Sequence, residues 1–235
     1  CGAPALRLAD CDFNAEQTFL LMRQAEKAGV KFLILPELGL TGATCGDLFT
    51  HPVLLNGCMN GLKKLIDASA DLQSVAVVGM PFMQHGKVFN CAVVVQQGEV
   101  LGVVPKTVLS ESDRRVFSAP ADTVMKYCDA LESIYTDVVP FGTKQLFISN
   151  GQQAFSFAVE IGEDLWHSFA LSVNPCTQGA MIIFNLSANA EIVGSHDYRK
   201  QNILAQSKKI SISSQNILND IGAISYIIKK GRRLY

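Results

Sequence analysis

Amphipathic helical patterns alternate with short apolar runs along most of this chain, and this alternation constrains the fold more than any other sequence feature. Apolar residues recur at helical spacing in three segments, which predicts helices over residues 12–30, 53–70 and 195–209. Asp12 or Asn14 is expected to cap the first helix, and Gly29 follows its last turn.

Apolar runs of strand length lie between these helices, at residues 31–38, 74–83 and 179–189. Two longer segments, 87–106 and 145–161, each contain an internal turn and are expected to form hairpins. The first turns at Gly98, and the second turns at an Asn-Gly pair, which is the strongest short hairpin signal. Helices that alternate with strands, with hairpins among them, predict an α/β protein whose layered sheet includes antiparallel pairs.

Composition excludes several classes of function. Hydrophobic residues make up 49% of the chain and charged residues 17%, which is typical of a globular protein. The net charge of −1 argues against nucleic-acid binding, which needs a basic face. No apolar run reaches the length of a membrane span, and the first residues lack a secretory leader, so we expect a cytoplasmic protein without a membrane partner.

Cysteine and histidine usage argues against a metal site. The seven cysteines are dispersed without a CxxC pair, as is common for reduced thiols in the cytoplasm. The four histidines are isolated from one another and from the cysteines. No metal is therefore expected.

Polar groups follow three of the predicted strands. Glu37 comes after "FLILP", Lys106 comes after "LGVVP", and Gly162-Glu163-Asp164 comes after "FSFAVEI". If these strand ends meet at one edge of the sheet, a buried glutamate and a lysine could act as base and charge stabiliser in acyl transfer. The plainer alternative is that both are charged residues at strand ends where solvent begins. Neither interpretation supplies a nucleophile.

Four motifs resemble, in order and spacing, the glutaminase domain of glutamine-dependent NAD synthetases, which belongs to the nitrilase (carbon-nitrogen hydrolase) superfamily. They are "LPELGLTGATCGDLF", "LGVVPKTVL", "VEIGEDLW" and "NLSANAEIVG…YRK". The resemblance implies a nitrilase-type α-β-β-α sandwich, expected here to be incomplete at both ends. It places a carbon-nitrogen hydrolase domain at residues 1–209 and a divergent tail at 210–235, in which "AISYII" has the composition of a strand.

The family uses a glutamate-lysine-cysteine triad, and the resemblance carries two of its members onto this chain. Glu37 matches the general base and Lys106 matches the lysine that stabilises the oxyanion. The family's nucleophilic cysteine falls at Gly162, so the thiol needed for covalent attack is missing at that position. Cys45 and Cys176 are the alternative thiols, and each is expected to be a buried or loop cysteine without catalytic duty.

The resemblance also implies a substrate site with several departures from the family. Glu163, which binds the amino group of glutamine in relatives, and Trp166 are retained. Asp113 stands near an expected glutamate in a shortened loop, and Asn189 replaces the second serine of the family's "SASN" loop. Ala43 stands where relatives usually have tyrosine.

The implied function is hydrolysis of the glutamine amide to supply ammonia for NAD synthesis, with the covalent step lost in this chain. Glutamine or a related small amide is the expected ligand, and an NAD synthetase domain or a second copy of the chain is a candidate partner. No cofactor is expected in this chain, because ATP and Mg would belong to a synthetase domain absent from the sequence. Two alternatives stay open: a non-catalytic module that docks on an intact synthetase, and a carbon-nitrogen hydrolase with an unexpected nucleophile.

Overall fold

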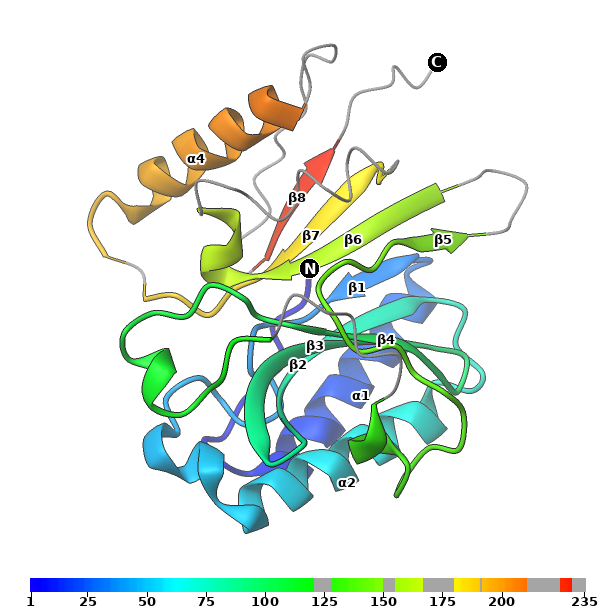
Figure 1. The fold of residues 1–235 in the computed structure, drawn as a ribbon. Helices are drawn as coiled ribbons and strands as arrows, with labels where there is room; N and C mark the ends of the chain where they lie inside the picture. Colours follow the sequence, from blue (N-terminus) through cyan, green and yellow to red (C-terminus); the bar gives the residue numbers. More distant parts are fainter. Residues whose placement is uncertain (121–127, 150–154, 167–179, 191, 211–224, 230–235) are drawn as a thin grey trace.

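The computed structural model describes residues 1–120, 128–149, 155–166, 180–190, 192–210 and 225–229. Its elements form four layers in the order helices, sheet, sheet, helix (Figure 1). Helices α1 and α2 cover the outer face of the first sheet, and α4 covers the outer face of the second. This arrangement confirms the predicted α/β class and the α-β-β-α sandwich.

The first sheet has the strand order β1-β2-β3-β4, with β1 parallel to β2 and the other pairs antiparallel. Its strands are β1 (Phe32–Ile34), β2 (Val75–Gln84), β3 (Lys87–Gln96) and β4 (Glu99–Pro105). The hairpin predicted over residues 87–106 is confirmed as β3 and β4. Strands β2 and β3 form a further hairpin that the sequence analysis did not identify, because its His85-Gly86 turn lacks an Asn-Gly or Asp-Gly signal. Both turn residues nevertheless have the positive φ angles, 49° and 71°, that tight hairpins require.

The second sheet has the order β5-β6-β7-β8, with β6 parallel to β7 and the outer pairs antiparallel. Its strands are β5 (Phe147–Ser149), β6 (Phe155–Ile161), β7 (Ile182–Leu186) and β8 (Ser225–Lys229). Pairing of β5 with β6 confirms the second hairpin, although its Asn150-Gly151 turn lies outside the described residues. Strand β8 comes from the predicted tail and pairs with β7 along its whole length, in agreement with the strand composition of that segment.

The inner faces of the two sheets enclose an apolar layer. Its buried side chains include Ile34, Val77, Val94, Phe157, Phe184 and Leu186. Because side chains alternate along a strand, Ala158 and Glu160 of β6 lie on the opposite face, where Ala158 packs with Ile203 of α4. The sheet therefore holds a buried carboxylate on the side that α4 covers.

The helices are α1 (Cys11–Lys27), α2 (Pro52–Ala68) and α4 (Ser195–Ile210). The prediction that Asp12 or Asn14 caps α1 is wrong, because the helix starts earlier and the Asp10 carboxylate accepts the hydrogen bond from the Phe13 N–H at 3.1 Å. Asn14 is instead buried, and its Nδ2 donates to the carbonyl oxygens of Arg7 and Leu40.

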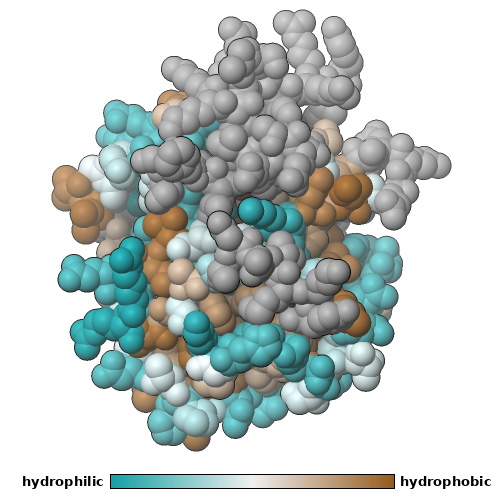
Figure 2. Space-filling model, in the orientation of Figure 1, coloured by the Kyte–Doolittle hydropathy of each residue, from teal (hydrophilic) through white to brown (hydrophobic). Residues whose placement is uncertain are grey.

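Helices α1 and α2 present apolar residues to the first sheet and polar residues outward. Figure 2 shows hydrophilic side chains across the lower part of the same view, where these helices lie. Within the described residues, no helix combines the length and apolar character needed to cross a membrane.

Candidate functional site

Glu37 lies just beyond β1, and hydrogen bonds fix both of its carboxylate oxygens. Oε1 accepts from Lys106 Nζ at 2.8 Å and from Asn90 Nδ2 at 2.7 Å, while Oε2 accepts from the Ala188 N–H at 3.2 Å. The side chain is only 6% exposed. Burial raises the pKa of the Glu37 carboxyl, against the opposing effect of the Lys106 ammonium.

A glycine in β2 makes this position of Glu37 possible. The segment from Pro36 to Leu38 crosses β2 so closely that a Cβ on Gly79 would overlap the Pro36 carbonyl oxygen and lie 2.7 Å from the Leu38 nitrogen. Only a residue without a side chain allows this approach. No local sequence pattern indicated this requirement at Gly79.

The side chain of Lys106 extends to the centre of the site. Its backbone N–H donates to Asn90 O at 2.8 Å, which continues the β3–β4 pairing beyond Pro105. Its Nζ contacts three carboxylates: Glu37 at 2.8 Å, Asp113 at 3.0 Å and Glu163 at 2.5 Å. The contacts with Glu37 and Asp113 are hydrogen bonds, and the contact with Glu163 is an ion pair.

The charge state of Lys106 follows from this environment. Burial opposes the charge on the ammonium, but the carboxylates of Glu37 and Glu163 more than offset it, so the pKa of Lys106 lies above its ordinary value. Lys106 is therefore a cation at neutral pH, and three carboxylates surround it.

Gly162 opens a short 3-10 turn, η4 (Gly162–Leu165), directly after β6, and its φ of +51° lies in the left-handed region. A Cβ built on Gly162 would lie 3.2 Å from Glu37 Oε2 and 3.2 Å from Lys106 Nζ. A side chain at this position would therefore project between the glutamate and the lysine. This geometry brings together the three strand ends that the sequence analysis singled out.

Asp164 ties the η4 turn to the loop that follows β4. Its Oδ1 accepts hydrogen bonds from the Thr107 N–H, the Thr107 hydroxyl and the Val108 N–H at 2.6–3.0 Å, and its Oδ2 accepts from the Ile161 N–H at 3.2 Å. The carboxylate thereby fixes Gly162 relative to Lys106. The sequence analysis noticed Asp164 beside Glu163 but gave it no role.

Two asparagines complete the support of the site, and the sequence analysis missed both. Asn90 holds Glu37, as described above, and Asn185 of β7 donates through Nδ2 to Gly162 O at 3.1 Å and to Glu160 Oε1 at 3.3 Å. Burial, followed by the Asp164 carboxylate, raises the pKa of Glu160 to about 8. The available signal was a single amide side chain within each of two apolar strands, because such a buried group needs a partner.

The remaining predicted site residues, Asp113, Trp166 and Asn189, differ in how near they lie to Glu37 and Lys106. Asp113 lies at the site through its contact with Lys106, whereas the Trp166 ring packs near Tyr198 of α4 with 6.2 Å between ring centroids. Asn189 is exposed, next to the Ala188 N–H that reaches Glu37. The substrate-binding roles of these residues stay predictions.

Neither alternative thiol gains support from the structure. Cys45 is buried, its Sγ donates to the carbonyl oxygens of Thr41 and Gly42, and burial raises its pKa, which disfavours the nucleophilic thiolate. Cys176 lies outside the described residues.

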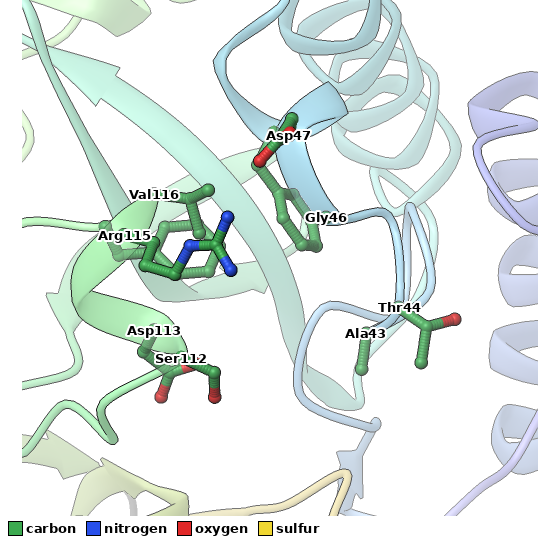
Figure 3. A pocket seen from close by; sticks show the side chains of 10 residues that line it. Ala43, Thr44, Gly46, Asp47, Ser112, Asp113, Arg115 and Val116 are labelled. Atoms are coloured by element: carbon green, nitrogen blue, oxygen red, sulfur yellow. The ribbon is translucent and has the colours of Figure 1, made fainter.

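A pocket of about 330 Å³ lies beside the site (Figure 3). Ala43 and Thr44 form part of one wall and Ser112 and Asp113 part of another, with the Arg115 side chain reaching toward the turn that carries Asp47. Asp113 lines the pocket and also contacts Lys106, so it connects the pocket to the buried glutamate and lysine. The pocket is large enough for a small polar molecule and carries charges of both signs.

Comparisons with known proteins identify relatives of this chain. Over 203 residues, 85% of the chain, the sequence is 32% identical to the "Glutamine-dependent NAD(+) synthetase" of Mycobacterium tuberculosis. The chain is homologous to glutamine-dependent NAD(+) synthetases. The homologue from Mycobacterium leprae is 31% identical over 206 residues, and the one from Rattus norvegicus is 26% identical over 193 residues. No family model matches the chain.

This synthetase homologue spans only part of the proteins it resembles, covering 29% of the length of both mycobacterial synthetases. Among solved structures, a glutamine-dependent NAD(+) synthetase from Cytophaga hutchinsonii superposes with a TM-score of 0.72 at 24% identity, over 88% of this chain and 33% of that one. A nitrilase-superfamily amidase from Nesterenkonia superposes with a TM-score of 0.68 at 14% identity, over 89% of this chain and 72% of the amidase. These superpositions show the nitrilase-type fold.

Proposed function

We propose that this chain is a glutaminase-type domain that holds a small primary amide, with glutamine as the first candidate, but does not carry out covalent hydrolysis. The observation that carries the proposal is the position of Gly162. A side chain there would project between Glu37 and Lys106, yet glycine provides no atom that could attack a carbonyl carbon.

The ligand class follows from homology and from the groups beside the pocket. The relatives are named glutamine-dependent synthetases, and an amidase of the same fold is described with an acrylamide adduct at its active-site cysteine. In this chain the Lys106 ammonium could donate to an amide carbonyl oxygen. Glu163 and Asp113, with side chains 30% and 23% exposed, could receive the amine or amide N–H groups of a ligand.

The surroundings of Lys106 further weaken the case for hydrolysis. Because three carboxylates lie against the Lys106 ammonium, a carbonyl oxygen that approaches it would displace one of them before Lys106 could stabilise an oxyanion. Asp113 and Glu163 are more exposed than Glu37 and are the groups that would move. We expect this displacement to make amide binding weak as well as unproductive.

The test combines an activity assay with a binding assay on the purified chain. We expect no ammonia release from glutamine above the rate without protein, together with saturable glutamine binding detected by ligand-observed NMR. Glu163→Gln is the matched variant, since it keeps the shape of the side chain and removes its charge; it should change the affinity without creating activity. Steady turnover that is lost in Cys45→Ala would show an unexpected nucleophile, and absence of glutamine binding would refute the ligand assignment.

A further inference from the structure

Helices α1 and α2 bring two cysteines together, one from each helix. Cys11 is the first residue of α1, Cys58 lies in the middle of α2, and their sulfur atoms are 3.5 Å apart. The two residues are separated by 47 positions in sequence. Neither takes part in the Glu37–Lys106 site, so the following inference is independent of the proposed function.

The separation of the sulfurs is compatible with a covalent bond. A disulfide has an S–S distance of about 2.05 Å, so the two thiols need to approach by roughly 1.5 Å. Cys11 already bonds toward α2, with its Sγ 3.8 Å from the Leu54 carbonyl oxygen. The two cysteine side chains therefore start close to bonding distance, and oxidation has to bring them together by only this amount.

Of the two cysteines, Cys11 borders a pocket, and 6% of the residue is exposed. Cys11 lines a pocket of about 450 Å³ together with Asp10, His51, Leu54 and Gly57, whereas Cys58 is fully buried behind it. A small oxidant that enters this pocket meets Cys11 first. Cys58 is then positioned as the resolving thiol.

We propose that Cys11 and Cys58 are a peroxide-sensitive thiol pair that forms a reversible disulfide between α1 and α2. The hydrogen bond from Cys58 lowers the pKa of Cys11, against the effects of burial and of the nearby Asp12 and Asp10 carboxylates. The positive end of the α1 dipole also favours a thiolate at the first helical residue.

The reaction with hydrogen peroxide balances in two steps. The Cys11 thiolate attacks one peroxide oxygen, the O–O bond breaks, and the departing hydroxide takes a proton to form water, which leaves Cys11 as a sulfenic acid. The Cys58 sulfur then attacks the Cys11 sulfur, the S–O bond breaks, and the hydroxyl group leaves with the Cys58 proton as a second water. Two thiols are oxidised by two electrons, and the peroxide is reduced to two waters.

The disulfide would restrain the segment that follows Glu37 in the candidate site. The start of α1 is bonded to the segment that follows Glu37, through Asn14 Nδ2 to Leu40 O at 3.1 Å and through Ala9 N to Thr41 O at 2.8 Å. Joining α1 to α2 would restrain this segment. The oxidised chain should accordingly melt at a higher temperature than the reduced chain, because a cross-link also restricts the unfolded state.

The experiment maps the disulfide directly in the full chain. A Cys1→Ser background removes the cysteine that is exposed in the described part of the chain. The folded protein is treated with hydrogen peroxide, alkylated under denaturing conditions and digested. Mass spectrometry should find a Cys11–Cys58 cross-linked peptide, with Cys91 and Cys128 alkylated, and dithiothreitol should abolish the cross-link and reverse the rise in melting temperature.

Two variants test whether Cys58 is the thiol that resolves the sulfenic acid on Cys11. In Cys58→Ser, peroxide should leave Cys11 as a sulfenic acid that dimedone traps, whereas Cys91→Ser should form the disulfide as the unmodified chain does. Since the mapping is also done without these substitutions, a variant that fails to fold does not decide the outcome. Recovery of Cys11 and Cys58 as free thiols after treatment that oxidises Cys1 in the unsubstituted chain would overturn the proposal, as would a disulfide between Cys11 and Cys45.

Discussion

Restoring the missing thiol by Gly162→Cys tests how much of the site survives around the glycine. The new Cβ would lie 3.2 Å from both Glu37 Oε2 and Lys106 Nζ and 3.4 Å from Lys106 Cε. These contacts are short for a carbon atom, so the Lys106 and Glu37 side chains must give way by a few tenths of an ångström in a close-packed site. The backbone φ of +51° adds a cost of about 1–2 kcal/mol for any L-residue with a side chain.

We expect the variant to be less stable by about 1–2 kcal/mol and to regain little activity. Its rate of glutamine hydrolysis should remain at least about 100-fold below that of an intact homologue, because a carbonyl oxygen must first displace Asp113 or Glu163 from Lys106, and a substrate held about an ångström from attack geometry loses that much rate. The Asp113 and Glu163 carboxylates lie against the Lys106 ammonium, which a substrate carbonyl must reach.

Urea denaturation measures the stability, and ammonia release measures the activity. A glutamine analogue that alkylates thiols reports separately whether the new sulfur is reactive. Gly162→Ala is the matched control, since it carries the same backbone cost without the sulfur. Recovery of the activity of an intact homologue would show that the occupied lysine and the altered loop are harmless, and it would refute the reasoning.

Two further predictions concern the support of the site. Asp164→Asn should destabilise the fold by about 3 kcal/mol in urea denaturation. The reason is that the amide cannot accept all the backbone and hydroxyl hydrogen bonds that the carboxylate accepts. Asp47→Asn is the control, and it should have little effect because Asp47 is exposed. The pKa of Glu160 is raised to about 8 in the folded protein and is about 4.3 in the unfolded chain. Between these pH values the folded state binds a proton that the unfolded state does not bind. The free energy of unfolding should therefore fall as the pH rises from about 5 to 8, by up to a few kcal/mol. Glu160→Gln imitates the protonated side chain and should remove most of that fall, and an unchanged pH dependence in this variant would contradict the assigned cause.

Local patterns in the sequence determined the layers of the fold. Helical and strand periodicity predicted the segments that became α1, α2, α4 and most strands, because such periodicity records which side of each element is buried. The ends of apolar strands indicated Glu37 and Lys106, and the family resemblance indicated Gly162 as the position of the nucleophile. The positions of Glu37 and Lys106 are local features, since each depends on a few neighbouring residues, whereas Gly162 was assigned from the order and spacing of four motifs.

The tertiary structure decided what surrounds these residues. Asn90 reaches Glu37 across 53 positions of sequence, and Asp164 reaches Thr107 across 57. Such contacts depend on strand register and on the stacking of two sheets, and periodicity reports neither. The pairing of Cys11 with Cys58 likewise depends on how α1 and α2 pack, because the spacing of two cysteines in a sequence does not set the distance between their sulfurs.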